Sequence, residues 1–379
     1  MYNLKSQRTA FNPALVTRLI CLCLLIIKLL CYKLWIAERD FPLVPVHEIL
    51  LRAPGFVHSF LFAAILFALL ALIFFPSKKW LIILFIAAQS GSFLLDQNRW
   101  KPWEYQFMFM LLPLVFLKDE KKIKICWQII FVGLYFFSGA GKCNSGFILR
   151  IWNYLMLQQW MGINTQDPWI YRLGYAMPLI EMAAAIGLLF NRSRKPAVVV
   201  LCLMHLMLFT MLGPPAGHYY NVIWPWNVLM IFLLIHLFYS NSFDLGMLKQ
   251  KQVLIWFTAL FWWFMPWLNL TGHLDDHFSS ALYSGKGQSL YICTSNVKTK
   301  KAYAAYFIAT GHNQPCDTML SVNAWSMQAM NVAPNPEQRV YRSIIRQWTL
   351  QNDPAGADRF FIMHPKFSKE RWMEIKGGK

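Results

Sequence analysis

A lysine ends one of the apolar runs of this chain, where Ile125 to Phe137 leads through Ser138-Gly139-Ala140-Gly141 to Lys142. A cation at the rim of a membrane span either snorkels to the interface or takes part in chemistry inside the membrane. The small residues before Lys142 favour a closely packed site. A lysine kept neutral by burial could act as a base, whereas one that reaches headgroup water only anchors its helix. Both interpretations stay open at this point.

A second polar group lies between two apolar runs, where ten residues from Asp96 to Tyr105 hold four charges, two Trp and one Tyr. Trp and Tyr are typical of the aromatic belts at membrane interfaces, and they also form the walls of binding sites. For the second interpretation we expect Asp96 to pair with Arg99, and the wall to consist of the aromatic side chains Trp100, Trp103 and Tyr105.

Three further residues complete the set of candidate ligand-binding positions. Glu181 and His205 lie inside apolar runs, where an ionisable side chain is a functional candidate by default. Glu181 equally fits a neutral helix contact, and one neighbouring helix can satisfy a neutral His205. His218 follows Gly213-Pro214-Pro215-Ala216-Gly217, where Gly and Pro break the helix and free backbone groups that a wet cavity could satisfy.

The elements that must position these residues are membrane helices, because 57% of the residues are hydrophobic and only 14% are charged. We predict an all-α polytopic membrane domain over residues 1–270 with about nine transmembrane helices. Their expected ranges are 14–35, 56–75, 80–95, 104–117, 125–141, 170–190, 197–213, 222–239 and 252–270. A broken aromatic stretch from Phe147 to Ile163 predicts an interfacial helix. We expect Lys28, in the first span, to snorkel or to face a neighbouring helix.

The placement of the basic residues predicts the orientation. With the N-terminus in the cytoplasm, the inner segments hold 13 Lys and Arg and the outer loops hold 7. The positive-inside rule therefore predicts a cytoplasmic N-terminus and an extracytoplasmic C-terminus, most simply in a bacterial inner membrane. The net charge of +18 thus indicates the lipid bilayer as partner and no nucleic acid.

Residues 271–379 have ordinary polarity and predict a small extracytoplasmic α+β domain that caps the helices. Residues 289–294 resemble a strand, and residues 339–348 an amphipathic helix that begins after Pro336. The eight cysteines include no Cys-x-x-Cys pair. Cys293 and Cys316 both lie on the predicted oxidising side, so we expect them to form a disulfide. The sequence suggests no metal site.

Two segments, Asp96 to Tyr105 and Tyr135 to Lys142, resemble the paired signatures of the HTTM membrane domain, the integral membrane part of vitamin K-dependent gamma-glutamyl carboxylase and of bacterial relatives. The run from His205 to Gly213 and Tyr283-Ser284-Gly285 are also similar to that family. The resemblance covers about Val16 to Gly285. It implies that Lys142 is the catalytic base, that a reduced quinone is the cofactor, and that the site opens to the outer side.

Gly141 and Trp103 stand where the carboxylase has a second lysine and a histidine, and the tail is too short for its large lumenal region. Protein-glutamate carboxylation is therefore not expected. The leading hypothesis is an outward-facing pocket for a quinone or another amphipathic lipid, with Lys142 as a base. The alternative is a non-catalytic membrane subunit or lipid-binding partner of an envelope protein. A transporter lacks support, since no inverted repeat is evident, and a thiol oxidoreductase would need a Cys-x-x-Cys pair.

Overall fold

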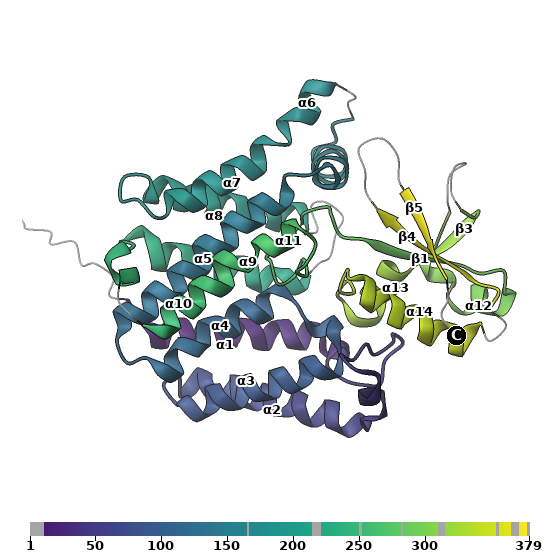
Figure 1. Cartoon of the computed structure of the whole chain (residues 1–379), viewed down its shortest axis with the longest axis horizontal. Coiled ribbons are helices and arrows are strands. Elements are labelled where there is room, and N and C mark those ends of the chain that lie inside the picture. The colour runs from purple at the N-terminus through teal and green to yellow at the C-terminus, as the bar shows by residue number, and fades with distance from the viewer. Residues whose placement is uncertain are drawn as a thin grey trace, which may run out of the picture.

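The structure is a computed structural model that describes residues 11–164, 167–213, 221–249, 252–281, 283–309, 315–353, 356–364 and 371–376. Long helices form a bundle, and a small sheet with three helices lies at one end of it (Figure 1). The chain is mostly helical, as the sequence predicts.

The first half of the bundle holds five helices: α1 (Pro13–Leu30), α2 (Gly55–Phe74), α3 (Lys79–Leu95), α4 (Pro102–Phe116) and α5 (Glu120–Lys142). Two of them begin at a side-chain cap. Asn12 accepts a hydrogen bond from the Leu15 amide at the start of α1, and Asp119 accepts one from the Lys121 amide at the start of α5. Such caps satisfy amides that a helix leaves unpaired at its first turn.

The second half is more irregular. A π-helix, η4 (Phe147–Trp160), covers the range of the predicted interfacial helix. It is followed by α6 (Pro168–Leu173), α7 (Ala176–Gly187), α8 (Arg194–Met211), α9 (Trp224–Leu234) with its π-helical continuation η7 (Ile235–Tyr239), and α10 (Val253–Ala259) with η9 (Leu260–Phe264) and α11 (Trp267–Leu270). Short 3₁₀ helices lie at η1 (Tyr32–Leu34), η2 (Glu48–Arg52), η3 (Gln97–Arg99), η6 (Asn221–Ile223), η8 (Leu245–Lys249) and η10 (Ala304–Tyr306).

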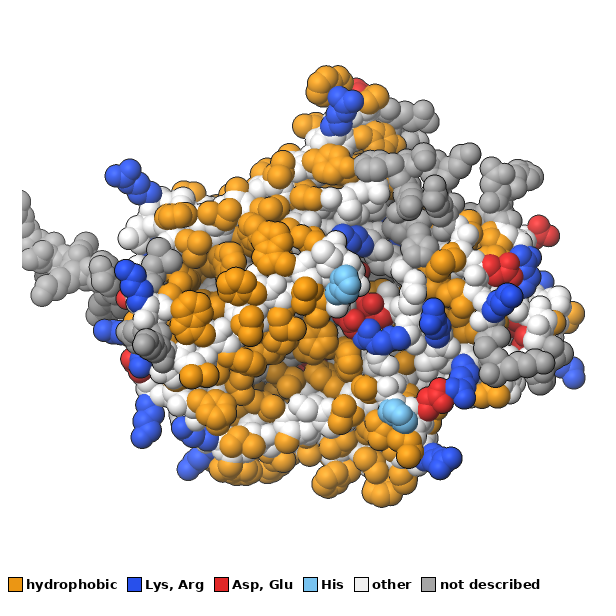
Figure 2. All heavy atoms as spheres, in the orientation of Figure 1, with side chains coloured by type: hydrophobic (Ala, Val, Ile, Leu, Met, Phe, Trp, Pro, Cys, Tyr) orange, Lys and Arg blue, Asp and Glu red, His pale blue; other side chains and the backbone are white. Residues whose placement is uncertain are grey.

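Six of the described helices are long and apolar enough to cross a membrane: Pro13–Leu30, Gly55–Phe74, Glu120–Lys142, Arg194–Met211, Asn221–Tyr239 and Val253–Leu270. The other three predicted spans are shorter helices here. α3 has 17 residues, α4 has 15 with Pro113 inside it, and α7 has 12. Figure 2 shows hydrophobic side chains over the middle of the bundle and Lys and Arg side chains gathered toward its two ends. The protein is therefore a membrane protein by helix length and composition.

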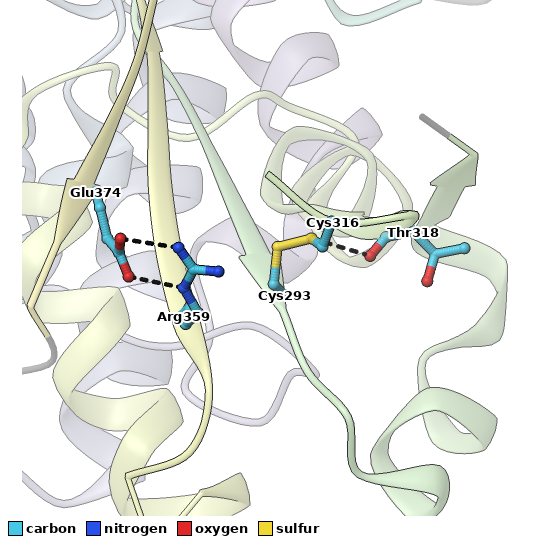
Figure 3. The surroundings of a disulfide bond; sticks show 5 residues. All are labelled: Cys293, Cys316, Thr318, Arg359 and Glu374. Carbon is cyan, nitrogen blue, oxygen red and sulfur yellow. Dashed lines mark hydrogen bonds and ion pairs between the residues drawn. A yellow bond between two sulfur atoms is a disulfide. The ribbon is translucent and has the colours of Figure 1, made fainter. Parts of the chain in front are cut away.

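The C-terminal part contains an antiparallel sheet of five strands in the order β2-β3-β1-β4-β5. Its strands are β1 (Ser289–Cys293), β2 (Phe307–Ala309), β3 (Thr318–Ser321), β4 (Arg359–His364) and β5 (Arg371–Ile375), and its helices are α12 (Val297–Ala302), α13 (Val322–Met330) and α14 (Gln338–Asn352). The predicted strand and amphipathic helix correspond to β1 and α14. A disulfide joins Cys293 on β1 to Cys316, just before β3 (Figure 3).

Loops at one end of the helical bundle hold the C-terminal part in place. Asn331 Nδ2 donates to the carbonyl of Leu30 at 3.0 Å, at the end of α1. Lys101 Nζ donates to the carbonyl of Ala333 at 2.5 Å, and Arg339 Nε donates to Gln97 Oε1 at 2.6 Å. Most buried apolar side chains of both parts belong to one continuous core, and Cys293, Met319 and Phe361 form a separate small cluster in the sheet.

Candidate functional site

The structure pairs the two ionisable residues that the sequence identified separately in its apolar runs. Lys142 is the last residue of α5, and its Nζ donates to Glu181 Oε2 of α7 at 2.5 Å. The same nitrogen donates to Ser138 Oγ, one turn earlier, at 2.9 Å. Lys142 is only 8% exposed and Glu181 only 4%. Lys142 therefore belongs to a buried ion pair, which the snorkelling interpretation does not describe.

Small residues make this pairing possible, because α5 and α7 approach each other closely. A Cβ atom added to Gly139 would lie 2.7 Å from Met182 Cγ and 2.8 Å from the carbonyl oxygen of Pro178. Any larger residue at position 139 would push α7 away and separate Glu181 from Lys142.

The pair lines a cavity of about 330 Å³ between η4, α7 and α8. Most of the other lining side chains are apolar, and five of them are methionines: Met156, Met177, Met204, Met207 and Met211. Methionine is flexible and polarisable, so such a wall adapts to ligands of different shapes. Glu181 Oε1 is buried and has no hydrogen-bond partner among the described residues. The cavity thus combines a long apolar wall with one ion pair and one buried carboxylate oxygen that has no hydrogen-bond partner among the described residues.

Segment Tyr283-Ser284-Gly285, which also resembles the HTTM domain in sequence, packs against the residues that follow Lys142. Asn144 Nδ2 donates to the carbonyl of Gly141 at 2.7 Å and to that of Ser284 at 2.8 Å. Gly285 has a φ of +68° and lies against the backbone of Gly146 with no room for a Cβ atom. This contact places Tyr283 on the wall of the cavity.

His205 lies in a hydrogen-bonded chain beside the cavity rather than on its wall. Its Nε2 is 2.6 Å from the Tyr135 hydroxyl, and its Nδ1 is 2.7 Å from Asn227 Oδ1. Both ring nitrogens therefore have partners from neighbouring helices. This is the structural role that the sequence analysis gave as the alternative to a functional one. His218 lies outside the described residues.

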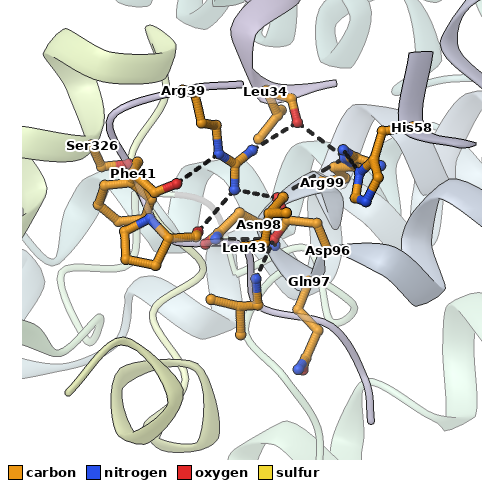
Figure 4. Close-up of polar contacts among 12 residues, drawn as sticks. Leu34, Arg39, Phe41, Leu43, His58, Asp96, Gln97, Asn98, Arg99 and Ser326 are labelled. Carbon is orange, nitrogen blue, oxygen red and sulfur yellow. Dashed lines mark hydrogen bonds and ion pairs between the residues drawn. The ribbon is translucent and has the colours of Figure 1, made fainter. Parts of the chain in front are cut away.

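The loop from Asp96 to Lys101 forms a buried polar cluster whose pairing differs from the expectation (Figure 4). The close partner of Asp96 is Arg39, whose Nη2 lies 2.6 Å from Asp96 Oδ2, whereas Arg99 Nε is 3.9 Å away. Arg99 instead reaches His58 Nδ1 at 2.9 Å and Ser92 Oγ at 2.8 Å. The expected Asp96–Arg99 pair is thus the weaker contact, because the extended segment after α1 brings Arg39 closer.

The three aromatic residues of this motif lie on no wall of the Lys142 cavity. Trp100 Nε1 donates to the carbonyl of Phe93 at 2.9 Å, and Tyr105 stacks on Phe278 with ring centroids 4.0 Å apart. Trp103 lines a different cavity. The motif packs where α3 ends and α4 begins, and its three aromatic side chains do not line the Lys142 cavity.

A second buried Lys–Glu pair was not foreseen from the sequence. Lys28 Nζ of α1 lies 3.0 Å from Glu104 Oε2 of α4 and 2.9 Å from Gln89 Oε1 of α3. The Trp35 ring lies 3.4 Å from the same nitrogen. The signal was present, because Lys28 and Gln89 are polar residues inside apolar runs. Glu104 belongs to the motif from Asp96 to Tyr105, and its spacing in the sequence does not indicate that Lys28 is its partner.

No family model, curated protein or solved structure matches this chain. Within the part of the chain that the structure describes, no group of three or more His, Cys, Asp or Glu side chains is placed to hold a metal ion.

Proposed function

We propose that this chain is a multi-pass membrane protein, similar to the integral membrane part of vitamin K-dependent gamma-carboxylase, that binds a quinone or another amphipathic lipid. In this proposal nine helices cross a bacterial inner membrane, with the N-terminus in the cytoplasm and the C-terminal domain outside. The observation that carries the proposal is the methionine-lined cavity of about 330 Å³ with the Lys142–Glu181 pair on its wall. An amphipathic ligand matches a wall that is apolar except for one charged pair.

The pair also suggests how the site would handle a proton. Lys142 Nζ donates to Glu181 Oε2 at 2.5 Å, so in this proposal Lys142 acts as a base only after it has passed that proton to Glu181. The unpaired Oε1 of Glu181 can accept a hydrogen bond from a ligand hydroxyl, such as that of a reduced quinone. Neutral Lys142 would then take the hydroxyl proton, and the ammonium group so formed would stabilise the oxyanion left on the ligand. Carboxylation of a protein glutamate is not part of the proposal.

Native mass spectrometry of the full chain, extracted together with its lipids, tests ligand binding directly. We expect a bound quinone or lipid in the wild-type protein and its loss in Lys142→Ala, while that variant still folds. Lys33→Ala is the matched control, because Lys33 is an exposed lysine. Retention of the same ligand by Lys142→Ala would show that the pair does not hold it.

The orientation has its own test in Cys143, which is exposed, whereas Cys21, Cys23, Cys31 and Cys126 are buried. If the outer ends are where we propose, a membrane-impermeant maleimide should label Cys143 on the outer face of intact membranes. Labelling only after the membrane is permeabilised would reverse the orientation. Cys143→Ser is the control for the identity of the labelled thiol.

The alternative function is a non-catalytic membrane subunit or lipid-binding partner of an envelope protein. It is favoured by one observation, that Trp100 and Tyr105 serve packing and do not reach the Lys142 cavity. A stable protein partner that co-purifies equally with wild type and with Lys142→Ala would support this alternative over the enzyme.

A further inference from the structure

The cavity beside the Lys142–Glu181 pair reaches the surface of the helical bundle between α7 and α8, which pack side by side (Figure 1). Among its described lining residues, only Ile180 of α7 and Leu203 of α8 are exposed, with exposed fractions of 51% and 59%. Both side chains are apolar. The cavity therefore has an apolar opening, which we define by these two residues and call the α7–α8 portal.

The portal lies at a depth where a membrane helix faces hydrocarbon. Leu203 stands in the middle of α8, one of the six described helices that are long and apolar enough to cross a membrane. The middle of such a helix lies within the hydrocarbon core of the bilayer. Leu179 and Leu206, on the same two helices but outside the cavity, are also apolar and exposed. The portal therefore opens into the bilayer and not into water.

The rest of the cavity is enclosed and leads to the ion pair. Ile180 precedes Glu181 in the chain, so the portal and the pair lie on the same turn of α7. Along α8 the lining residues run from Val200 to the buried Met211, a length of about 16 Å at the rise of an α-helix. A ligand that fills this space has its polar group at the pair and an apolar part along α8.

The pair restricts the polar group that can approach it. Glu181 Oε1 is buried and has no hydrogen-bond partner among the described residues, so a ligand group that donates a hydrogen bond relieves the cost of its burial. A hydroxyl group is such a donor. It also meets this need without bringing a second negative charge to the carboxylate.

We propose that the ligand of the Lys142 cavity enters laterally from the bilayer through the α7–α8 portal. It is an uncharged, hydroxyl-bearing lipid, whose hydrocarbon chain lies between Ile180 and Leu203 while its hydroxyl group reaches Glu181. This inference rests on the proposed function, because it needs a ligand at the pair, and it adds the route of entry and the place of the chain.

The probe for the experiment is a naphthoquinol, kept reduced, with an isoprenoid chain that carries a photoreactive diazirine. Native mass spectrometry measures its binding to the full chain in lipid nanodiscs. The double variant Ile180→Trp with Leu203→Trp fills the portal with larger side chains, and we expect it to weaken binding about tenfold or more. On illumination of the wild type, the diazirine should label residues of α7 and α8 at the portal.

The double variant Leu179→Trp with Leu206→Trp is the matched control, because it adds the same side chains to the same helices outside the cavity. It should bind the probe like the wild type. Thermal unfolding shows whether each variant is folded, and Leu203→Trp with Leu206→Trp as its control replaces the doubles if the portal double does not fold.

The outcomes separate the portal from the function on which it rests. If the wild type binds no probe, the proposed function and the portal both fail. If binding is lost in Lys142→Ala but is equal in the portal and control variants, the proposed function stands and the portal is overturned. Labelling of residues away from α7 and α8 would overturn the portal as well.

Discussion

Two buried Lys–Glu pairs lie in the helical bundle, one within its first half and one between its two halves, and they differ in what surrounds them. Lys28 and Glu104 join α1 to α4, and both side chains are fully buried. Gln89 and Trp35 complete the surroundings of Lys28. Lys142 and Glu181 join α5 to α7, and they face a methionine-lined cavity. The same two residue types are therefore enclosed by side chains in one place and face a cavity in the other.

The comparison shows that a buried ion pair in a membrane bundle is not in itself a sign of function. Each pair leaves one carboxylate oxygen without a hydrogen-bond partner among the described residues, Glu104 Oε1 and Glu181 Oε1. Glu181 lines the methionine-lined cavity, whereas Glu104 lines none of the cavities described here. The presence of that space, more than the charge, distinguishes the candidate site.

The largest expected effect belongs to the enclosed pair. Lys28→Ala would leave the Glu104 carboxylate buried with no cation beside it, which costs about 3–5 kcal/mol when one partner of a buried pair is removed. We expect poor folding or a much lower melting temperature in detergent. The double variant Lys28→Met with Glu104→Leu, which removes both charges, should recover most of the stability. A melting temperature unchanged by Lys28→Ala alone would contradict the comparison.

The sequence predicts which residues are unusual, but it does not predict which of them pair across helices. Apolar runs predicted the helices, and polar residues within them singled out Lys142 and Glu181. Their partnership depends on the close approach of α5 and α7 at Gly139, which no local pattern reveals. Likewise Asp96 pairs with Arg39, which is 57 positions away in the chain. Pairing across helices is a tertiary property, so sequence spacing favoured the nearer but weaker partner, Arg99.

A smaller effect is expected at the turn that supports Lys142. Gly285→Ala adds a Cβ atom against the Gly146 backbone at a φ of +68°, where L side chains are strained. We expect a loss of about 2–3 kcal/mol and weaker ligand binding, because the contact positions Tyr283 on the cavity wall. Gly272→Ala is the control for backbone strain alone, because Gly272 also has a positive φ, of +78°, but no atom lies near the added Cβ. Equal ligand binding in both variants would show that the turn does not shape the cavity.

The pair at the cavity should tolerate loss of its lysine better than the enclosed pair does. In Lys142→Ala the Glu181 side chain still borders the cavity, where water can replace the lysine, so we expect a loss of only about 1–2 kcal/mol. Melting temperatures of Lys28→Ala and Lys142→Ala, measured side by side in the same detergent, test the difference. Equal decreases in melting temperature would mean that the cavity does not lower the cost of leaving Glu181 without its lysine.

The smallest effect is a pH dependence of the stability, caused by His277 where the helical bundle meets the C-terminal part. The pKa of His277 is lowered to about 3 because the ring is buried beside Lys101, so the folded protein favours the neutral ring. An unfolded histidine titrates near pH 6.5, so this stability is complete above that pH and is lost progressively as the pH falls toward 3. The expected loss is about 1 kcal/mol between pH 6.5 and 5.5.

His277→Asn should remove this part of the pH dependence, because an amide can keep a hydrogen bond to the Trp100 carbonyl without titrating. The measurement is the melting temperature of wild type and variant at a series of pH values in one detergent. Lys101 contributes in the opposite range: burial lowers its pKa to about 8, so its charge destabilises the fold below that pH and the penalty disappears as the pH rises toward 10.5. Identical curves for wild type and His277→Asn below pH 6.5 would exclude His277 as the titrating group.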